Sequence, residues 1–427
     1  MDTKNLGKSD QNTHSSTDAG KKKVSPPSSK PSPNIGHQKS SYFKPHIVQS
    51  GENLWSIAAA YQTNVYEIMG FNHIYHPSYI YPGEKLIIPV QNRTPRTIEV
   101  NGYIEITSEG NEIKTVQDIA PHLTYLSIFG YYPKPDGSLS SLNDARLIRT
   151  ARQNGVAPLM VITNFVDGIF NADLAHLVLS YKDIRMKLIR QILTVLKAKH
   201  YSGIHLDFEG VRDEDRPLLV DFLATLKKYA ADRHFILSTV LMPRHADIQG
   251  ASPGAIYGHS GKDYSAYGNI ADFVVLMNDY WGWAGGPPSP VAPLDQVKRV
   301  LKNVLSTIAA DKVIMGIPLY GYNWTFPYTV KSQRARSLSA QAALELAAGI
   351  KTPIHYDAVA QCPYYHYIDR SGRPHIVWFE DERSITAKYK LANILGLRGL
   401  SYWSLNPSFS QNHKLLDDMF KIKKVLR

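Results

Sequence analysis

The sequence predicts an α/β protein whose main part is a (β/α)8 barrel, the TIM-barrel fold. Eight short apolar runs, each typical of a buried strand, follow one another between residues 98 and 427. Helical stretches such as 173–200 and 216–232 separate them. Strands that alternate with helices indicate a parallel sheet, and eight such units are the number that closes a barrel. The expected strands are 101–106, 125–132, 158–165, 203–209, 236–243, 272–279, 313–321 and 399–405.

The N-terminal residues have a different composition. Residues 1–43 consist mainly of Ser, Pro, Lys, Asn and Gly, which bury too little apolar surface to offset the entropy lost on ordering. We therefore expect a disordered basic tail that acts as a solvated spacer. The first residues hold no apolar core of the kind that a secretory signal needs, and no run of eighteen apolar residues occurs, so neither classical export nor a membrane span is expected.

The charge and the cysteine content narrow the classes of partner. A formal net charge of +11 suits a polyanion, either nucleic acid or an acidic cell-wall polymer. The chain has no Arg-rich helix, zinc-finger pattern or RNP-like strand, which argues against nucleic acid. The single cysteine, Cys362, excludes an intrachain disulfide and a multi-cysteine zinc site. We expect a monomer without a cofactor or metal.

Residues 46–90 form a separate pattern, strand, helix, helix and strand. The strand HIVQ precedes a helix that starts after Ser50-Gly51-Glu52-Asn53, and a second helix follows Thr63-Asn64. Tyr81-Pro82-Gly83 then turns into the closing strand KLIIPV. The segment resembles the LysM domain in its SGENLWSIA opening, in Asn72 and in its IYPGEKLIIP ending. A small βααβ LysM domain is thus expected before the barrel.

The LysM resemblance implies binding to N-acetylglucosamine-containing glycans such as peptidoglycan and chitin. It places the ligand against two loops, whose residues are Gly51, Glu52, Asn53 and Leu54 in the first and Ile80, Tyr81, Pro82 and Gly83 in the second. For Trp55 and Leu54 a role in the core is the alternative, and we expect Trp55 to be a core residue.

The stretch GIHLDFEG (203–210) places two acids in an apolar, strand-like run. In a strand, His205, Asp207 and Glu209 point to one side, and the apolar residues between them point to the other. The acids would therefore face the barrel axis, with Glu209 at the C-terminal mouth, where barrel enzymes hold their catalytic groups. Two carboxyls at adjacent inward positions disfavour each other's ionisation, so one of them can act as an acid near neutral pH.

Structural roles compete with catalysis for the polar residues of this stretch. A buried ion pair is the alternative for the two acids, but the predicted strands carry no Lys or Arg in their interiors. A metal site would need more His or carboxylate neighbours than these strands offer. A lone inward histidine such as His205 is more often a hydrogen-bonded core residue than a base. The sequence therefore favours catalysis for the acids and a core role for His205.

Residues 98–427 resemble glycoside hydrolase family 18, in particular its LysM-bearing branch of spore-cortex-lytic N-acetylglucosaminidases. The matching segments are LDFEG, GWAGGPPSPVAP, GIPLYGYNW, VWFED and GLSYWSL. That family cleaves β-1,4 bonds beside N-acetylglucosamine with retention, through attack by the 2-acetamido oxygen of the substrate itself. The resemblance implies that Glu209 protonates the leaving oxygen and later activates water, and that Asp207 orients the acetamido group.

The chain departs from the family pattern in two places. The longest form of the motif is D-x-x-D-x-D-x-E, and Ser202 and His205 occupy its first two acidic positions. On the sixth strand the usual M-x-Y followed by an acid reads Met277-Asn278-Asp279-Tyr280, with tyrosine and acid exchanged. Either Asp279 or Tyr280 would then contact the acetamido carbonyl.

Aromatic residues are expected to complete the sugar site. Trp403 matches the family's tryptophan beneath the sugar at the cleavage point, with a structural tryptophan as the alternative. Met277, Tyr322 and Trp281 are further candidates for substrate contact. A hairpin about residues 369–372 indicates a small α+β insertion before the last strand, which would form one wall of the site.

The sequence favours an N-acetylglucosaminidase of peptidoglycan, acting on spore cortex or its fragments. A chitinase-type hydrolase is the alternative within the enzyme class, and a non-catalytic glycan-binding spore coat protein is the alternative outside it. The intact pair Asp207 and Glu209 favours the enzyme. The resemblance, with no export signal seen, suggests location in the coat and cortex region of a spore.

Overall fold

The computed structural model describes residues 43–61, 63, 65–72, 74, 76, 78, 80–89, 95–107, 110–244, 263–279, 281–329, 334–406 and 411–426. Two sequence predictions lie outside these residues. They are the disordered tail, up to residue 42, and the contact assigned to Tyr280.

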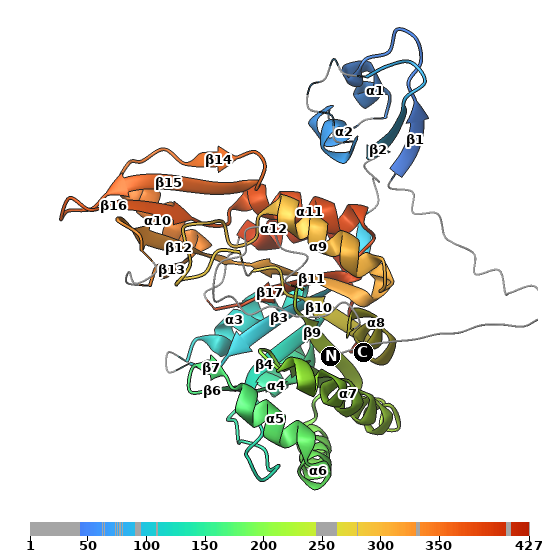
Figure 1. The fold of residues 1–427 in the computed structure, drawn as a ribbon, viewed down its shortest axis with the longest axis vertical. Coiled ribbons are helices and arrows are strands. Elements are labelled where there is room, and N and C mark those ends of the chain that lie inside the picture. The colour runs from blue at the N-terminus through green and yellow to red at the C-terminus, as the bar shows by residue number, and fades with distance from the viewer. Residues whose placement is uncertain are drawn as a thin grey trace, which may run out of the picture. The chain divides into compact units, whose positions relative to one another are not determined.

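Eight parallel strands form a closed barrel, as the sequence predicts (Figure 1). Each strand pairs with its neighbours in chain order, and pairing of the last with the first closes the ring. The strands are β3 (Arg96–Glu105), β4 (Tyr125–Tyr131), β5 (Ala157–Thr163), β8 (Gly203–Asp207), β9 (Ile236–Leu241), β10 (Phe273–Leu276), β11 (Val313–Pro318) and β17 (Gly399–Trp403).

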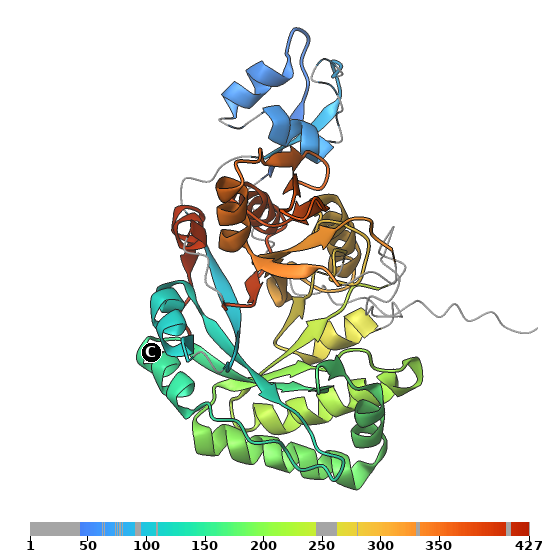
Figure 2. The same ribbon diagram turned by 90° about the vertical axis from the view of Figure 1, so that its left-hand side faces the viewer.

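Helices surround the barrel strands (Figure 2). An outer apolar layer lies between strands and helices, and a second, smaller cluster of buried side chains fills the barrel interior. The period-2 alternation of the strands divides the residues between the two layers. The helices are α3 (Glu112–Ile119), α4 (Ala145–Gln153), α5 (Ala172–Ser180), α6 (Lys182–Lys199), α7 (Arg216–Ala231), α8 (Asp263–Ile270), α9 (Leu294–Leu305), α11 (Glu382–Ile394) and α12 (Gln411–Met419).

Charged groups gather at the N-terminal end of the barrel, away from its mouth. Glu99 of β3 is buried and accepts hydrogen bonds from Arg398, which precedes β17, and from Lys423. Lys423 follows β18 (Phe420–Ile422), which pairs with the start of β3. These ion pairs join the two ends of the barrel sequence where the ring closes.

An α+β insertion stands between β11 and α11. It consists of β12 (Tyr320–Thr325), β13 (Arg336–Ser339), α10 (Ala340–Gly349), β14 (His355–Asp357), β15 (Cys362–Ile368) and β16 (Pro374–Trp378). The strands form one antiparallel sheet in the order β13, β12, β16, β15, β14. The hairpin predicted about residues 369–372 is the turn between β15 and β16. The insertion begins earlier than the sequence suggested, because the seventh barrel strand ends at Pro318 and β12 starts at Tyr320.

The N-terminal segment has the predicted βααβ order. It contains β1 (Phe43–Ile47), α1 (Leu54–Ala60), α2 (Val65–Asn72) and β2 (Lys85–Pro89), with β1 and β2 antiparallel. Asn53 caps α1 by accepting a hydrogen bond from the Ser56 amide. The side chain of Asn72, at the end of α2, donates from its Nδ2 to the Ile87 carbonyl in β2 and accepts at its Oδ1 from the Ile87 amide. These two hydrogen bonds hold the helix and the sheet together.

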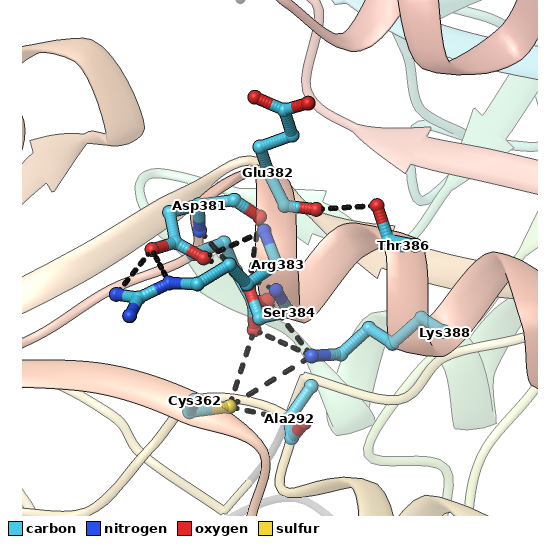
Figure 3. Close-up of polar contacts among 9 residues, drawn as sticks. Ala292, Cys362, Asp381, Glu382, Arg383, Ser384, Thr386 and Lys388 are labelled. Carbon is cyan, nitrogen blue, oxygen red and sulfur yellow. Dashed lines mark hydrogen bonds and ion pairs between the residues drawn. The ribbon is translucent and has the colours of Figure 1, made fainter. Parts of the chain in front are cut away.

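A buried ion pair links the insertion to α11. Figure 3 shows its lysine, Lys388, with Cys362 beside it. Lys388 of α11 and Glu380 are each 1% exposed, and the lysine Nζ lies 2.8 Å from the Glu380 Oε2. The Cys362 Sγ of β15 lies 3.8 Å from both side chains, and burial raises the pKa of this thiol. Cys362 is therefore a packing residue of this cluster and not a nucleophile.

The substitution Glu380→Gln should lower the free energy of unfolding by about 3–5 kcal/mol, because it leaves the Lys388 ammonium buried without a counter-charge. The double variant Glu380→Leu with Lys388→Met should lose much less, since it removes both charges. Urea denaturation of the two variants and the wild type measures the difference. Equal losses in the two variants would contradict this role for the ion pair.

Candidate active site

Strand β8 arranges its side chains as the alternation predicts. Ile204, Leu206 and Phe208 pack in the outer apolar layer, against the helices. His205 and Asp207 point into the barrel, where they are 0% and 1% exposed. The sequence thus directs the acidic residues to the interior because the apolar residues between them occupy the other side of the strand.

Glu209 is fixed at the mouth of the barrel by Asn164, which follows β5. The Asn164 Oδ1 accepts a hydrogen bond from the Glu209 amide at 2.9 Å, and its Nδ2 donates to the Glu209 carbonyl at 2.8 Å. The next residue, Gly210, has a φ of 62°, which glycine adopts without steric cost. The Glu209 backbone is therefore fixed by its two hydrogen bonds to Asn164, and the chain turns at the residue that follows it. Asn164 was not singled out from the sequence, although it is the last residue but one of the predicted strand 158–165.

His205 is a neutral hydrogen-bonding residue below Asp207. Ser238 on β9 donates its hydroxyl proton to the Ile204 carbonyl at 3.3 Å, so its oxygen accepts from the His205 Nδ1 at 2.7 Å. The His205 Nε2 then accepts from the Tyr103 hydroxyl. Burial lowers the pKa of His205 to about 3 and raises that of Tyr103 well above its ordinary range. Both residues therefore stay uncharged across the physiological range of pH.

Burial also favours the protonated forms of the acids. It raises the pKa of Asp207 well above its ordinary range, the charge of Asp279 adds to the rise, and a hydrogen bond with Glu209 opposes it. The Asp207 Oδ1 has no hydrogen-bond partner within the part of the chain that the structure describes. Asp207, Glu209 and Asp279 all lie close enough to the Tyr103 hydroxyl to raise its pKa. The site is thus a group of three acids around one neutral phenol.

Asp279 extends the site toward the insertion. Its Oδ2 accepts a hydrogen bond of 3.0 Å from the hydroxyl of Tyr320, the first residue of β12. Burial raises the pKa of Asp279 to about 6, while the bond from Tyr320 lowers it. Neither Tyr320 nor Tyr103 was among the sequence candidates. Tyr320 lies within the GIPLYGYNW segment that carries the family resemblance, and Tyr103 is an inward-facing residue of the first barrel strand. Both could therefore have been identified from the sequence.

Trp403 lies at the C-terminal end of β17, half-buried over the interior cluster. Its ring meets those of Tyr103 and Phe129 edge to face, at centroid distances of 5.1 and 5.3 Å. The structure therefore brings Trp403 beside the same tyrosine that contacts His205. The role that the resemblance implied for Trp403, a ring under the sugar, stays a prediction.

The remaining candidates fall in different places. Met277 is buried in the interior cluster, next to the site. Tyr322 is half-buried on β12 and meets Tyr320 edge to face at 5.6 Å. Trp281 is 4% exposed and packs in the outer apolar layer. Trp281 therefore presents no ring face to a sugar, and packing in the apolar layer explains its position.

The two predicted glycan-binding loops of the LysM segment lie together. Gly83 donates its amide proton to the Val48 carbonyl, and the Val48 amide donates to the Glu84 carbonyl, at 2.8 and 2.9 Å. The second loop is thereby held beside the strand end from which the first loop leaves. Gly51 and Gly83, with φ of 86° and 89°, form the two turns.

Within these loops, exposure separates surface residues from core residues. Tyr81 is 67% exposed and Pro82 is also exposed, whereas Ile80 packs against the small core. Leu54 is 0% exposed, so the prediction that it contacts glycan is wrong in this structure. The prediction that Trp55 is a core residue is also wrong, because it is 57% exposed. Helix α1 directs Leu54, Ile57 and Ala58 inward and leaves Trp55 outside.

Glu52 and Asn53 of the first loop have structural partners. Glu52 accepts hydrogen bonds from the Gln49 amide and from His46, which lower the pKa of its carboxyl. The Asn53 side chain is the helix cap. Both side chains therefore fix the shape of the loop that presents Gly51.

No cluster of three or more His, Cys, Asp or Glu side chains with metal-binding geometry occurs among the described residues. Across the same part of the chain, the helices are too short or too polar to cross a membrane.

The model of glycosyl hydrolases family 18 matches residues 109–407, and the LysM model matches residues 46–89. The chain belongs to glycosyl hydrolases family 18. It is therefore a glycosidase by family, with a LysM domain before the barrel.

The relatives of this chain include proteins whose names refer to lysis of spore cortex or of its fragments. The cortical fragment-lytic enzyme of Bacillus subtilis (strain 168) is 36% identical over 435 residues, which cover 90% of this chain and 99% of the relative. The crystal structure of the Bacillus cereus spore cortex-lytic enzyme SleL matches with a TM-score of 0.73 and 35% identity, covering 89% of this chain and 87% of that chain. The di-N-acetylchitobiase of Rattus norvegicus is 26% identical over 250 residues, covering 52% of this chain and 65% of the relative.

The buried acids should make the stability of this family 18 chain fall as pH rises. The pKa of Asp279 is higher in the folded state than its ordinary value of 3.8, so its contribution is complete below about pH 4 and is lost as pH rises through about 6. Two pKa units correspond to about 3 kcal/mol. Asp279→Asn should remove this part of the pH dependence, measured by urea unfolding between pH 4 and 7.

The matched control is Asp118→Asn, whose carboxylate is half exposed in a surface ion pair with Lys114. That variant should keep the wild-type pH dependence. If Asp279→Asn kept it as well, Asp279 would not be held in its protonated form by burial.

Proposed function

We propose that this chain hydrolyses β-1,4 bonds beside N-acetylglucosamine in bacterial peptidoglycan, with spore cortex or its fragments as the substrate. Glu209 is the general acid and base, and Asp207 orients the 2-acetamido group of the sugar. The observation that carries the proposal is the buried Asp207, hydrogen-bonded to Glu209 at the mouth of a family 18 barrel. Barrel enzymes keep their catalytic groups at this end of the strands.

The proposed reaction has two steps. The acetamido oxygen attacks the anomeric carbon while Glu209 gives its proton to the departing glycosidic oxygen, which leaves a cyclic oxazolinium ion. Water then adds to the anomeric carbon as Glu209 takes a proton from it, and the acetamido group is restored. Asp207 stabilises the positive ring, and it is suited to this because its environment contains no competing cation among the groups that shift its pKa, within the described residues.

The hydrogen bond between the two acids supports this division of roles. The bond lowers the pKa of Asp207, so Glu209 is its donor and carries the proton that general acid catalysis needs. Asn164 supports it further by fixing the backbone of Glu209 at both its amide and its carbonyl. The proton donor is thus fixed in place before a substrate arrives.

Asp279 takes the role that tyrosine has in the usual motif. In its protonated form the carboxyl donates a hydrogen bond to the acetamido carbonyl, while its Oδ2 accepts from Tyr320. Its burial supports this assignment, because a buried carboxyl without a cation favours the protonated form. Trp403, over the interior cluster, supplies the ring on which the sugar stacks.

The substrate class follows from the two domains taken together. Family 18 and LysM both indicate binding of a glycan that contains N-acetylglucosamine. The relatives named above, cortical fragment-lytic and spore cortex-lytic enzymes, cover most of this chain and support spore cortex over chitin. They also support association of this protein with the spore. The match to a chitobiase keeps chitin oligomers as the second candidate substrate.

The proposal predicts that Glu209→Gln lowers kcat on purified cortex peptidoglycan by at least about 100-fold, since a positioned acid and base contributes that much or more. Binding to insoluble peptidoglycan should be unchanged, because the LysM loops are intact. Mass spectrometry of the reducing ends measures release. N-acetylglucosamine at the new reducing ends supports the proposed cut, and N-acetylmuramic acid at those ends would contradict it. Equal, negligible release by wild type and variant would favour a non-catalytic glycan-binding coat protein.

The role of Asp279 predicts a pH effect on catalysis. As pH rises through about 6, Asp279 loses the proton with which it donates, so kcat/KM should fall on that side. Asp279→Asn keeps a donor at every pH and should flatten this part of the profile. The ratio of variant to wild-type kcat/KM, measured from pH 4 to 8, should therefore rise with pH. A constant ratio would exclude Asp279 as the donor.

A further inference from the structure

Strand β3 ends at the barrel mouth with an acid that the proposed reaction does not use, Glu105. Inward and outward side chains alternate along a barrel strand. Asn101 and Tyr103 point into the barrel, because Asn101 bonds to Ser401 across the interior and Tyr103 belongs to the interior cluster. Ile104 packs in the outer layer. Glu105 therefore points inward, at the next inward position toward the mouth after Tyr103.

Glu105 lies beside the ring on which the proposed function stacks a sugar. Tyr103, two residues before Glu105, meets the Trp403 ring edge to face. Phe129, the register partner of Glu105 on β4, meets the same ring edge to face. Two residues along a strand span about 7 Å. The Glu105 carboxyl is therefore a polar group at the rim of the aromatic surface around Trp403.

The Glu105 carboxyl is half-buried without a compensating partner. Burial alone raises its pKa, and among the described residues no hydrogen bond and no neighbouring charge contributes to the shift. The Asn406 Nδ2 donates to the Glu105 carbonyl at 3.2 Å, so the strand end is fixed through the backbone and does not need the carboxyl. An acid that is partly removed from water without a partner is unfavourable for folding. Proteins keep such groups mainly at functional sites.

Glu105 is set apart from the catalytic acids. In the ring of eight strands, β3 lies three places from β8, which carries Asp207, and three places from β10, which Asp279 follows. Glu105 is not among the groups that shift the pKa of Asp207, Asp279 or Tyr103. It therefore takes no part in the proton sharing of those acids and faces the site from another side of the mouth.

We propose that Glu105 is a further substrate-binding residue, which accepts hydrogen bonds from uncharged donors of the glycan, its hydroxyl and amide N–H groups. The inference rests on the proposed function, because it concerns the same glycan in the same site. An ionised carboxyl accepts hydrogen bonds and donates none, so it fits the hydroxyls at the edge of a sugar that stacks on Trp403. Hydrogen bonds to a charged acceptor are stronger than those between neutral groups.

The test is steady-state hydrolysis of solubilised cortex peptidoglycan by the full chain. Glu105→Gln should raise KM about tenfold and leave kcat unchanged, because bonds to this carboxyl hold the substrate and the transition state alike. Glu105→Ala, which removes the acceptor altogether, should raise KM at least as much. The matched control is Asp118→Asn, which removes the same charge from a surface ion pair and should change neither constant.

Stability provides a second measurement, which separates binding from a structural role. The pKa of Glu105 is higher in the folded chain than its ordinary value, so its ionised form costs stability at neutral pH. Glu105→Gln should therefore raise the midpoint of urea unfolding at pH 7 while it raises KM. A carboxyl that holds the fold together would give the opposite result, a lower midpoint, and that result would contradict the inference.

The outcomes also separate this inference from the proposed function. If the wild type does not cleave cortex peptidoglycan, the proposed function fails. If the wild type cleaves it and both variants of Glu105 keep the wild-type KM, the proposed function stands and the inference is overturned, since Glu105 is then a rim residue without contact to the glycan. A fall in kcat with unchanged KM would overturn it as well, because the loss would then lie in the chemical step.

Discussion

The removal of the Asp207 carboxyl from water is the constraint on which the rest of the site depends. Asp207 is 1% exposed at the end of β8, and a carboxylate without solvent or a cation is costly. Among the described residues, no lysine or arginine is one of the groups that shift the pKa of Asp207. The surroundings instead supply a second acid that can share a proton. The pKa of the Asp207 carboxyl is therefore raised, and its Oδ1 has no hydrogen-bond partner among the residues that the structure describes.

The barrel interior separates polar groups by charge along its length. In its middle, neutral side chains satisfy one another. Asn101 donates to Ser401 and accepts from Ser127, at 2.9 and 2.8 Å. The cations are kept at the N-terminal end, where Arg398 and Lys423 pair with Glu99. A guanidinium at the mouth would lower the pKa of Asp207 and stabilise its charge before the reaction. Neither Arg398 nor Lys423 is among the groups that shift the pKa of Asp207.

The sequence predicted the barrel and the inward-facing acids because every barrel strand follows the same local rule, the alternation of inward and outward side chains. Alternation on eight strands assigns inward and outward residues without knowledge of distant contacts, and it placed His205 and Asp207 correctly. It did not find Tyr320 or Asn164, whose roles depend on how a loop or an insertion meets another strand. Trp281 and Trp55 were misassigned for the same reason, since burial of a large ring depends on tertiary neighbours that composition does not reveal.

The replacement of an acid by His205 follows from the same constraint. A second aspartate at that position would place a further carboxyl below Asp207 and would raise the pKa of both. A neutral histidine accepts a hydrogen bond from the Tyr103 hydroxyl and donates one to the Ser238 hydroxyl, so it fills the position and adds no charge. Tyr103 is held in turn, and its ring supports Trp403 from below. One uncharged network thus holds Tyr103 and Trp403 in place and adds no further charge beside Asp207.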